Sequence, residues 1–276
     1  MAEQQRDTGN TRDAREPREA RAVRGPQGSR GSHESSEWSQ EPPECPESHE
    51  PRTPREPRED ERRAWCDLVA TARRTVADGL VVGTSGNVSV RVGDTVLVTP
   101  SGVPYDRLTP DDVTGVGLDG RQVLGTLRPT SELPMHLAVH RSTPARAVVH
   151  THAVHATAVS TLVPELPLIH YMAGALGGPV RVAPYATYGT EELAAHVLRA
   201  LADRSGCLLR NHGTLTHGAT LDQAYDRTAQ LEWMCRLWLT ASSVPGLTPS
   251  LLSPQELARA EERLRGYGQP ELRPEA

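Results

Sequence analysis

Three histidines follow two apolar runs of the chain in a pattern that could hold a metal ion. His150 and His152 lie one residue apart at the end of the run 147–149, and His212 follows the run 207–209. Because side chains alternate between the two faces of an extended chain, residues i and i+2 can direct two imidazoles toward one ion. Catalytic zinc takes three protein ligands and keeps a further position open for water or substrate. The spacing therefore indicates a zinc site.

Other titratable groups near this motif have more than one possible role. From spacing alone, His155 competes with His212 for the place of third ligand, because it lies only a few residues beyond the paired histidines. Glu132 could be a charge that favours a helix N-terminus, or a metal ligand and general base. His136 and His140 lie one helical turn apart, and we expect surface or supporting roles for them rather than metal binding.

Three loops of small residues could bind an anion. They span residues 83–87, 99–102 and 129–132. Successive backbone amides in such loops form anion-binding nests, and the last loop lies just before a predicted helix whose N-terminus also favours negative charge. Each loop alone is typical of an ordinary turn. Together with a metal site, the loops favour a phosphorylated substrate.

The composition limits the chemistry that is open to this chain. Its basic side chains are all arginine, because the sequence contains no lysine. A Schiff base on lysine and a lysine-anchored pyridoxal cofactor are therefore impossible. Carbonyl chemistry in this protein would instead need a metal ion to stabilise the negative charge that develops on the substrate. The formal net charge of -5 gives no bulk basic character, and we expect no nucleic-acid partner.

Cysteine spacing and hydropathy indicate the compartment. The 4 cysteines are widely separated and form no CxxC pair, which favours a reducing cytoplasm over a disulfide framework. No apolar run approaches the ~20 residues that a membrane span needs, and the charged N-terminus carries no apolar signal segment. We expect a soluble, cytoplasmic protein with no membrane partner.

The chain changes character near residue 60. Residues 1–58 are rich in Arg, Glu, Pro, Ser and Gly, and they carry too few apolar groups to offset the entropy of ordering them. We expect a disordered tail, whose loss should leave activity intact. Its interleaved Arg and Glu favour a solvated linker over a tether for nucleic acid or a protein partner. A folded domain is expected over 59–270, followed by a flexible terminus at 271–276.

Hydrophobic periodicity predicts one α/β domain with a central mixed or antiparallel sheet flanked by helices. Apolar residues from Trp65 to Val76 recur at helical spacing, and Gly79 ends this first helix. Valines alternating around Gly93 and Asp94 predict a hairpin over 88–98. Further helices are predicted at 131–141, 152–160, 190–203, 221–241 and 253–266. Short strands are predicted at 146–150, 180–184 and 206–210.

Taken together, these motifs resemble the class II aldolase and adducin-head family. The resemblance is carried by the segments 129–132, 149–155, 169–172, 183–190, 210–213 and 266–268. Among them, 169–172, 183–190 and 266–268 look most like the branch of the family that cleaves ketose 1-phosphates such as L-fuculose 1-phosphate. The match runs in order from about Arg62 to Gly268, which is nearly the whole predicted domain.

The resemblance implies a role for each matching residue. One zinc ion per subunit would be bound by His150, His152 and His212, with Glu132 as a further ligand in the resting enzyme and as the acid/base during turnover. The residues implied to hold the substrate phosphate are Asn87, Ser101, Gly102, Thr130 and Ser131. The residues implied at the aldehyde end are Tyr171, Tyr188 and Tyr267. Tyr171 and Tyr267 would be catalytic, since a tyrosine hydroxyl can assist the departing oxygen, and Tyr188 would contact the substrate. Tyr188 stands where phenylalanine is expected, and Thr130 where serine is expected, which leaves the aldehyde preference open.

The resemblance also implies an activity and an assembly. The activity is zinc-dependent retro-aldol cleavage of L-fuculose 1-phosphate or a deoxyribulose 1-phosphate to dihydroxyacetone phosphate and an aldehyde. Family members form fourfold tetramers with the active site between subunits, so a homotetramer is expected. Alternatives within the family are an L-ribulose-5-phosphate 4-epimerase and a methylthioribulose-1-phosphate dehydratase. A non-catalytic adducin-like binding module is the alternative from a different class, and it is disfavoured because such heads lack the ligand set.

Overall fold

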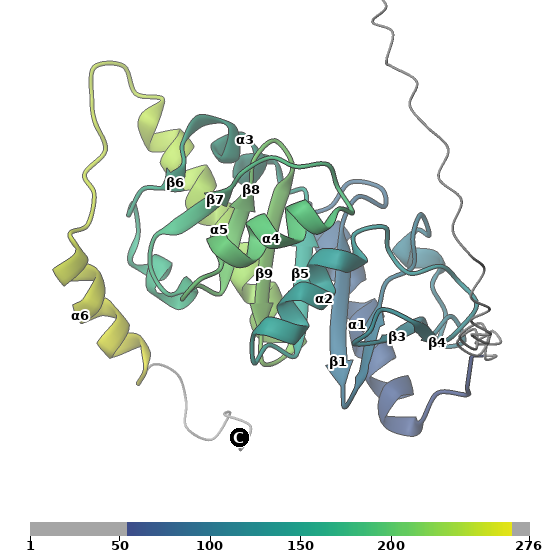
Figure 1. Ribbon diagram of the computed structural model, residues 1–276. Coiled ribbons are helices and arrows are strands. Elements are labelled where there is room, and N and C mark those ends of the chain that lie inside the picture. Colours follow the sequence, from purple (N-terminus) through teal and green to yellow (C-terminus); the bar gives the residue numbers. More distant parts are fainter. Residues whose placement is uncertain (1–53, 267–276) are drawn as a thin grey trace, which may run out of the picture. The chain divides into compact units, whose positions relative to one another are not determined.

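The computed structural model describes residues 54–266, which form a mixed β-sheet with helices on both faces (Figure 1). The strands are β1 Asn87–Val92, β2 Thr95–Val98, β3 Gly115–Gly117, β4 Gln122–Leu124, β5 Ala147–Thr151, β6 Glu165–Leu166, β7 Val180–Ala183, β8 Gly206–Leu209 and β9 Gly213–Gly218. The helices are α1 Glu59–Ala77, α2 Leu133–Ser142, α3 Val154–Leu162, α4 Glu191–Ala200, α5 Leu221–Ser242 and α6 Pro254–Leu264, with short 3-10 helices η1 Tyr105–Arg107 and η2 Tyr171–Leu176. Among residues 54–266, no helix is long and apolar enough to cross a membrane.

The strand order of the sheet is β4-β3-β2-β1-β5-β9-β8-β7-β6. Neighbouring strands are antiparallel except for β7 and β8, which pair in parallel. The predicted fold class, an α/β domain with a central mixed sheet flanked by helices, is confirmed. Every helix and strand expected from periodicity is present, with ends shifted by only a few residues.

Four strands were not predicted: β3, β4, β6 and β9. Of these, β9 matters most, because it lies in the sheet between β5 and β8. Its sequence alternates threonine with other residues between two glycines, a composition that is typical of loops. In the fold these threonines are buried and bonded: Thr214 Oγ1 lies 2.8 Å from Thr151 Oγ1, and Thr216 Oγ1 donates to the Ala224 carbonyl over 2.8 Å.

The helices divide between the two faces of the sheet (Figure 1). On one face, α2 and α4 pack over β5 and β8 through a core that includes Met135, Val139, Leu193 and Val197. On the other face, α1 packs under β1 and β2, while α3 and α5 share a second core beside it. The sheet is therefore buried on both sides at its centre, where β1, β5 and β9 adjoin.

The segment before α1 contacts the folded domain. The Arg55 amide donates to the Val123 carbonyl over 3.0 Å, and the Arg55 guanidinium bonds both carboxylate oxygens of buried Glu61, at 2.8 and 2.5 Å. Burial raises the pKa of Glu61, but hydrogen bonds from Arg55 and Arg58 outweigh burial and lower it to about 2. Arg55 and Arg58, which sequence reasoning assigned to the tail, thus contact the folded domain. The rest of the expected tail and the terminus 267–276 lie outside the described residues.

Candidate functional site

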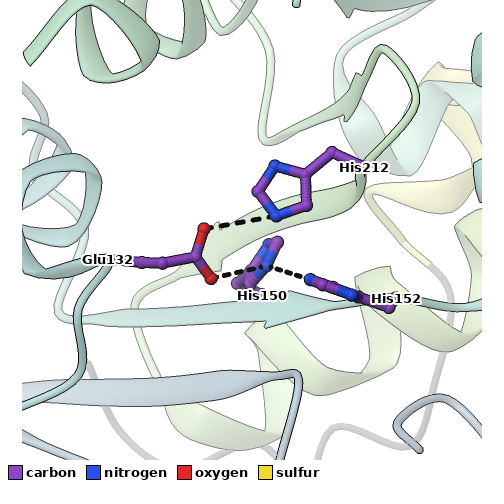
Figure 2. A group of neighbouring side chains, drawn as sticks. All are labelled: Glu132, His150, His152 and His212. Atoms are coloured by element: carbon purple, nitrogen blue, oxygen red, sulfur yellow. Dashed lines mark hydrogen bonds and ion pairs between the residues drawn. The ribbon is translucent and has the colours of Figure 1, made fainter. Parts of the chain in front are cut away.

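Paired strands bring three imidazoles to one point (Figure 2). His150 lies in β5 and His152 just after it, while His212 immediately precedes β9. Because β5 and β9 pair with Thr151 opposite Thr214, the end of one strand meets the start of the other. The centroids of the three rings are 4.8 to 4.9 Å apart and their planes are steeply inclined.

Glu132, at the N-terminus of α2, completes the cluster from the opposite side (Figure 2). Its Oε2 lies 3.0 Å from His150 Nε2 and its Oε1 lies 3.2 Å from His212 Nε2, while the Nε2 atoms of His150 and His152 are 3.0 Å apart. Ligand atoms around a tetrahedral zinc lie roughly 3.3 Å from one another, given Zn–N distances of about 2.0 Å. The ligand atoms of all four side chains lie within 4.8 Å of one another, close enough to hold a metal ion. Glu132 Oε1 is buried without a hydrogen-bond partner, which is the condition of an oxygen that coordinates an ion.

The surroundings keep these groups in the protonation states that metal binding requires. His150 Nδ1 lies 2.7 Å from the Thr214 carbonyl, so this nitrogen carries the proton and Nε2 turns its lone pair toward the cluster. Burial, followed by the neighbouring imidazoles of His150 and His212, lowers the pKa of His152 to about 4, so this ring is neutral near pH 7. Burial raises the pKa of Glu132, but the neighbouring imidazoles of His150 and His212 and the Asn87 amide outweigh burial and hold this pKa well below the usual range.

Gly213 permits the close approach that forms this cluster. A Cβ atom at this position would lie 2.1 Å from the Thr151 carbonyl oxygen and 3.2 Å from His152 Cδ2. Any side chain would therefore push the start of β9 away from the end of β5, and with it His212 from His152.

A cavity of about 320 Å³ opens beside the cluster. Its lining includes all of the residues predicted to hold phosphate, namely Asn87, Ser101, Gly102, Thr130 and Ser131. The loops that carry them are joined: the Thr130 amide donates to the Thr99 carbonyl over 3.1 Å, and the Ser101 amide donates to the Arg128 carbonyl over 3.0 Å. Within residues 54–266 the lining contains no arginine, so an anion here would be held by hydroxyls, amides and the N-terminus of α2.

The three predicted tyrosines are placed differently. Tyr188 lines the cavity. Tyr171 begins η2, is 45% exposed, stacks against His170 with ring centroids 4.3 Å apart, and does not line the cavity of its own chain. Tyr267 lies outside the described residues. Of the two tyrosines that the structure describes, Tyr188 lies at the site of its own chain and Tyr171 does not.

The remaining histidines near the motif have other partners. His155 Nδ1 lies 2.6 Å from Glu232 Oε1, so this residue, which competed with His212 by spacing, stands outside the ligand cluster. His136 and His140 are buried between α2 and the sheet, and both contact the Ser89 hydroxyl. A surface role is therefore excluded for them, and a supporting role remains.

Several residues at the site carried no assigned role in the sequence. Tyr185 and Asn211 line the cavity, and Asn211 has a φ of 56°, a left-handed conformation that asparagine adopts more readily than most residues. Its position directly before a candidate ligand was the available signal. The hydroxyl of buried Tyr105 donates to the Gly86 carbonyl and fixes the loop that precedes Asn87. Nothing in its spacing pointed to this contact.

Comparison with known proteins agrees with this geometry. Residues 66–239 match the family described as Class II Aldolase and Adducin N-terminal domain. The L-fuculose phosphate aldolase of Escherichia coli O6:H1 (strain CFT073) is 44% identical over 192 residues, which cover 69% of this chain and 88% of that protein. The 5-deoxy-D-ribulose 1-phosphate aldolase of Bacillus thuringiensis serovar kurstaki is 34% identical over 206 residues, covering 74% and 96%. A solved L-fuculose 1-phosphate aldolase superimposes with a TM-score of 0.71 at 31% identity, covering 76% of this chain and 98% of that one. The chain therefore belongs to the class II aldolase and adducin family.

Proposed function

We propose that this protein is a metal-dependent aldolase that cleaves a ketose 1-phosphate to dihydroxyacetone phosphate and a short aldehyde. The observation that carries the proposal is the cluster of Glu132 with three histidines, opening directly onto a cavity lined by hydroxyl-bearing loops. The ligand set favours zinc, because imidazole nitrogens with one carboxylate suit it and leave exchangeable positions.

The protein's own groups have distinct tasks in this reaction. His150, His152 and His212 would hold the ion, with Glu132 as a ligand until substrate arrives. A bound ion supplies the Lewis acidity that stabilises negative charge on the substrate oxygens when the carbon–carbon bond breaks. Glu132, once free of the ion, is placed to carry the proton to or from the carbon beside the carbonyl. The preorganised cluster therefore replaces the lysine that other aldolases use.

The loops supply position. A phosphate held by the hydroxyls of Ser101, Thr130 and Ser131, and by the Asn87 amide, would fix the reacting carbons against the ion. Because no arginine among residues 54–266 lines this cavity, the backbone amides at the N-terminus of α2 would supply positive potential near this phosphate.

The aldehyde end requires a second copy of the chain. Tyr171 is exposed and lies away from its own cavity, so we propose that it reaches the cavity of a neighbouring subunit in a homotetramer. Tyr188 would approach the aldehyde from within the same chain, and Tyr267 retains the role that the family resemblance implies.

For the substrate, we propose L-fuculose 1-phosphate or a 5-deoxyribulose 1-phosphate. The support is that this chain aligns with 88% of a relative named for the first compound and 96% of a relative named for the second. The test measures kcat/KM for both compounds by dihydroxyacetone phosphate release, with L-ribulose 5-phosphate as the epimerase control. Release from one of the two ketose 1-phosphates supports the proposal. Epimerisation of the 5-phosphate without release would contradict it.

Metal binding is tested by a matched pair of variants. His152→Ala is expected to lose the ion and the activity together, whereas His155→Ala, three residues along and bonded to Glu232, keeps the ion. Metal content is measured by atomic emission on each purified variant. Full metal occupancy in His152→Ala would refute the ligand assignment.

A further inference from the structure

A chain of buried hydrogen bonds leaves the candidate metal centre and runs between β1 and α2. Asn87 Nδ2 lies 2.9 Å from Glu132 Oε2, and Asn87 Oδ1 lies 2.6 Å from His136 Nε2. The Ser89 hydroxyl then lies 2.7 Å from His136 Nδ1 and 2.8 Å from His140 Nε2. Each of these residues is at most 5% exposed, so bulk water has little access to the bonds.

The two elements explain why the four residues meet. Asn87 and Ser89 are two apart on β1 and so share one face of the strand. His136 and His140 are four apart on α2 and so share one face of the helix. Asn87 pairs with His150 across β1 and β5, so the Asn87 end of this hydrogen-bond chain lies beside the ligand cluster.

The donor and the acceptor of each hydrogen bond in this series can be assigned, because each neutral group has a fixed number of protons. The Glu132 carboxylate only accepts, so the Asn87 amide must turn its NH2 group toward it and its oxygen toward His136. His136 Nε2 must then carry the proton, which leaves Nδ1 to accept from the Ser89 hydroxyl. His140 Nε2 lies 2.8 Å from the Ser89 oxygen, whereas His140 Nδ1 lies 3.3 Å from the Ala145 carbonyl; the shorter contact favours the proton on Nε2, from which Ser89 accepts. Burial lowers the pKa of His136 to about 3 and that of His140 to about 4, consistent with two neutral rings.

We propose that His136, held by Ser89 and His140, is a positioning residue that fixes the Asn87 amide with its NH2 group toward Glu132 and the cavity. This inference rests on the proposed function, in which Glu132 moves a proton and Asn87 contacts the phosphate. Without the proton on His136 Nε2, the amide can reverse and set its oxygen against the Glu132 carboxylate. Two acceptors would then face each other at about 3 Å in a buried site, which destabilises the working arrangement.

Two substitutions of His136 separate positioning from packing. His136→Gln carries an amide nitrogen near the position of Nε2 and can still donate to Asn87. His136→Asn is shorter, reaches only the position of Nδ1 beside Ser89, and cannot donate to Asn87. Both remove the same ring from the same buried place, so a purely structural role predicts similar losses in the two.

The expected result is a split between these variants in kcat with metal content unchanged. His136→Gln should stay within about threefold of the wild type, and His136→Asn should lose roughly tenfold to a hundredfold, the effect of one hydrogen bond to a charged site. Equal losses in both variants would overturn the positioning role.

A second measurement does not depend on catalysis. In wild-type, metal-loaded protein labelled with ¹⁵N-histidine, long-range nitrogen–proton correlations report which ring nitrogen of each neutral histidine carries the proton. We expect the His136 signal, identified by its absence in His136→Gln, to show protonated Nε2 and unprotonated Nδ1. A proton on Nδ1 would overturn the inference even in an active enzyme. The expected tautomer in a protein that cleaves no ketose 1-phosphate would support the ordering of the chain while the proposed function fails.

Discussion

Replacing Arg55 with alanine is expected to lower the free energy of unfolding at neutral pH by about 2 kcal/mol. The reason is Glu61, a carboxylate with no exposed surface that receives two hydrogen bonds from the Arg55 guanidinium. Arg58 donates two more, from its amide at 2.9 Å and from its guanidinium at 3.1 Å. Removal of the Arg55 guanidinium leaves a buried charge with half of its donors.

The magnitude follows from the pKa of Glu61, which is lowered from 4.5 to about 2 despite burial. Each pKa unit corresponds to about 1.4 kcal/mol, so the partners together favour the charged form by roughly 3 kcal/mol. Arg55 is 43% exposed, and solvent screening reduces its share to about 2 kcal/mol. For a domain of this size the loss corresponds to a melting temperature lower by roughly 4 to 8 °C.

Chemical denaturation of wild type, Arg55→Ala and Arg62→Ala measures this difference. Arg62 pairs with Glu56 at 3.2 Å on the surface, so its replacement should cost at most about 0.5 kcal/mol. The pKa of Glu61 is lower in the folded state, so its stabilisation is complete above pH 4.5 and declines as the pH falls toward 2. The gap between Arg55→Ala and wild type should therefore narrow at pH 3.5. Equal stability of the two arginine variants at pH 7 would refute the reasoning, as would a gap that does not change with pH.

Other perturbations have equally direct expectations. A protein that begins at residue 54 should match the full chain in stability. One that begins at residue 59 should melt several degrees lower, because it lacks Arg55. Equal melting curves for these two truncated proteins would contradict this expectation. Gly213→Ala should lower metal content measured by atomic emission, because the added Cβ would lie 2.1 Å from the Thr151 carbonyl; full occupancy would argue against that steric account. Tyr105→Phe should raise KM for a phosphorylated substrate about tenfold by releasing the Gly86 carbonyl, with a smaller change in kcat, and steady-state kinetics distinguish the two.

Much of the fold could be predicted because its elements carry strong periodicity. The apolar stripe of α1 and the valines of the β1–β2 hairpin are read directly from the sequence. Strand β9 could not be, because Thr214 and Thr216 are buried polar residues whose partners are known only once β5 and α5 are in place. The start of the folded domain could not be predicted either, because nothing in the polar segment around Arg55 indicates that this residue pairs with a buried carboxylate.

The candidate site was predictable in its residue types and less so in its arrangement. Spacing identified His150 and His152, but the choice of His212 over His155 depended on family resemblance, and the geometry places His212 in the cluster. The roles of His136 and His140 depend on which face of α2 meets β1, which no local pattern reveals. Tyr171 illustrates a further limit, because its proposed role at the cavity of a neighbouring subunit involves a contact that a single chain does not contain.

The most direct test of the central claim is release of dihydroxyacetone phosphate by zinc-loaded protein, measured in a coupled assay before and after chelation and again after zinc is restored. L-fuculose 1-phosphate and 5-deoxyribulose 1-phosphate are the substrates, and His152→Ala is the control. The account predicts release that chelation abolishes and zinc restores, with none from the variant. Release that persists after complete removal of the metal, or no release from either substrate by the metal-loaded enzyme, would contradict it.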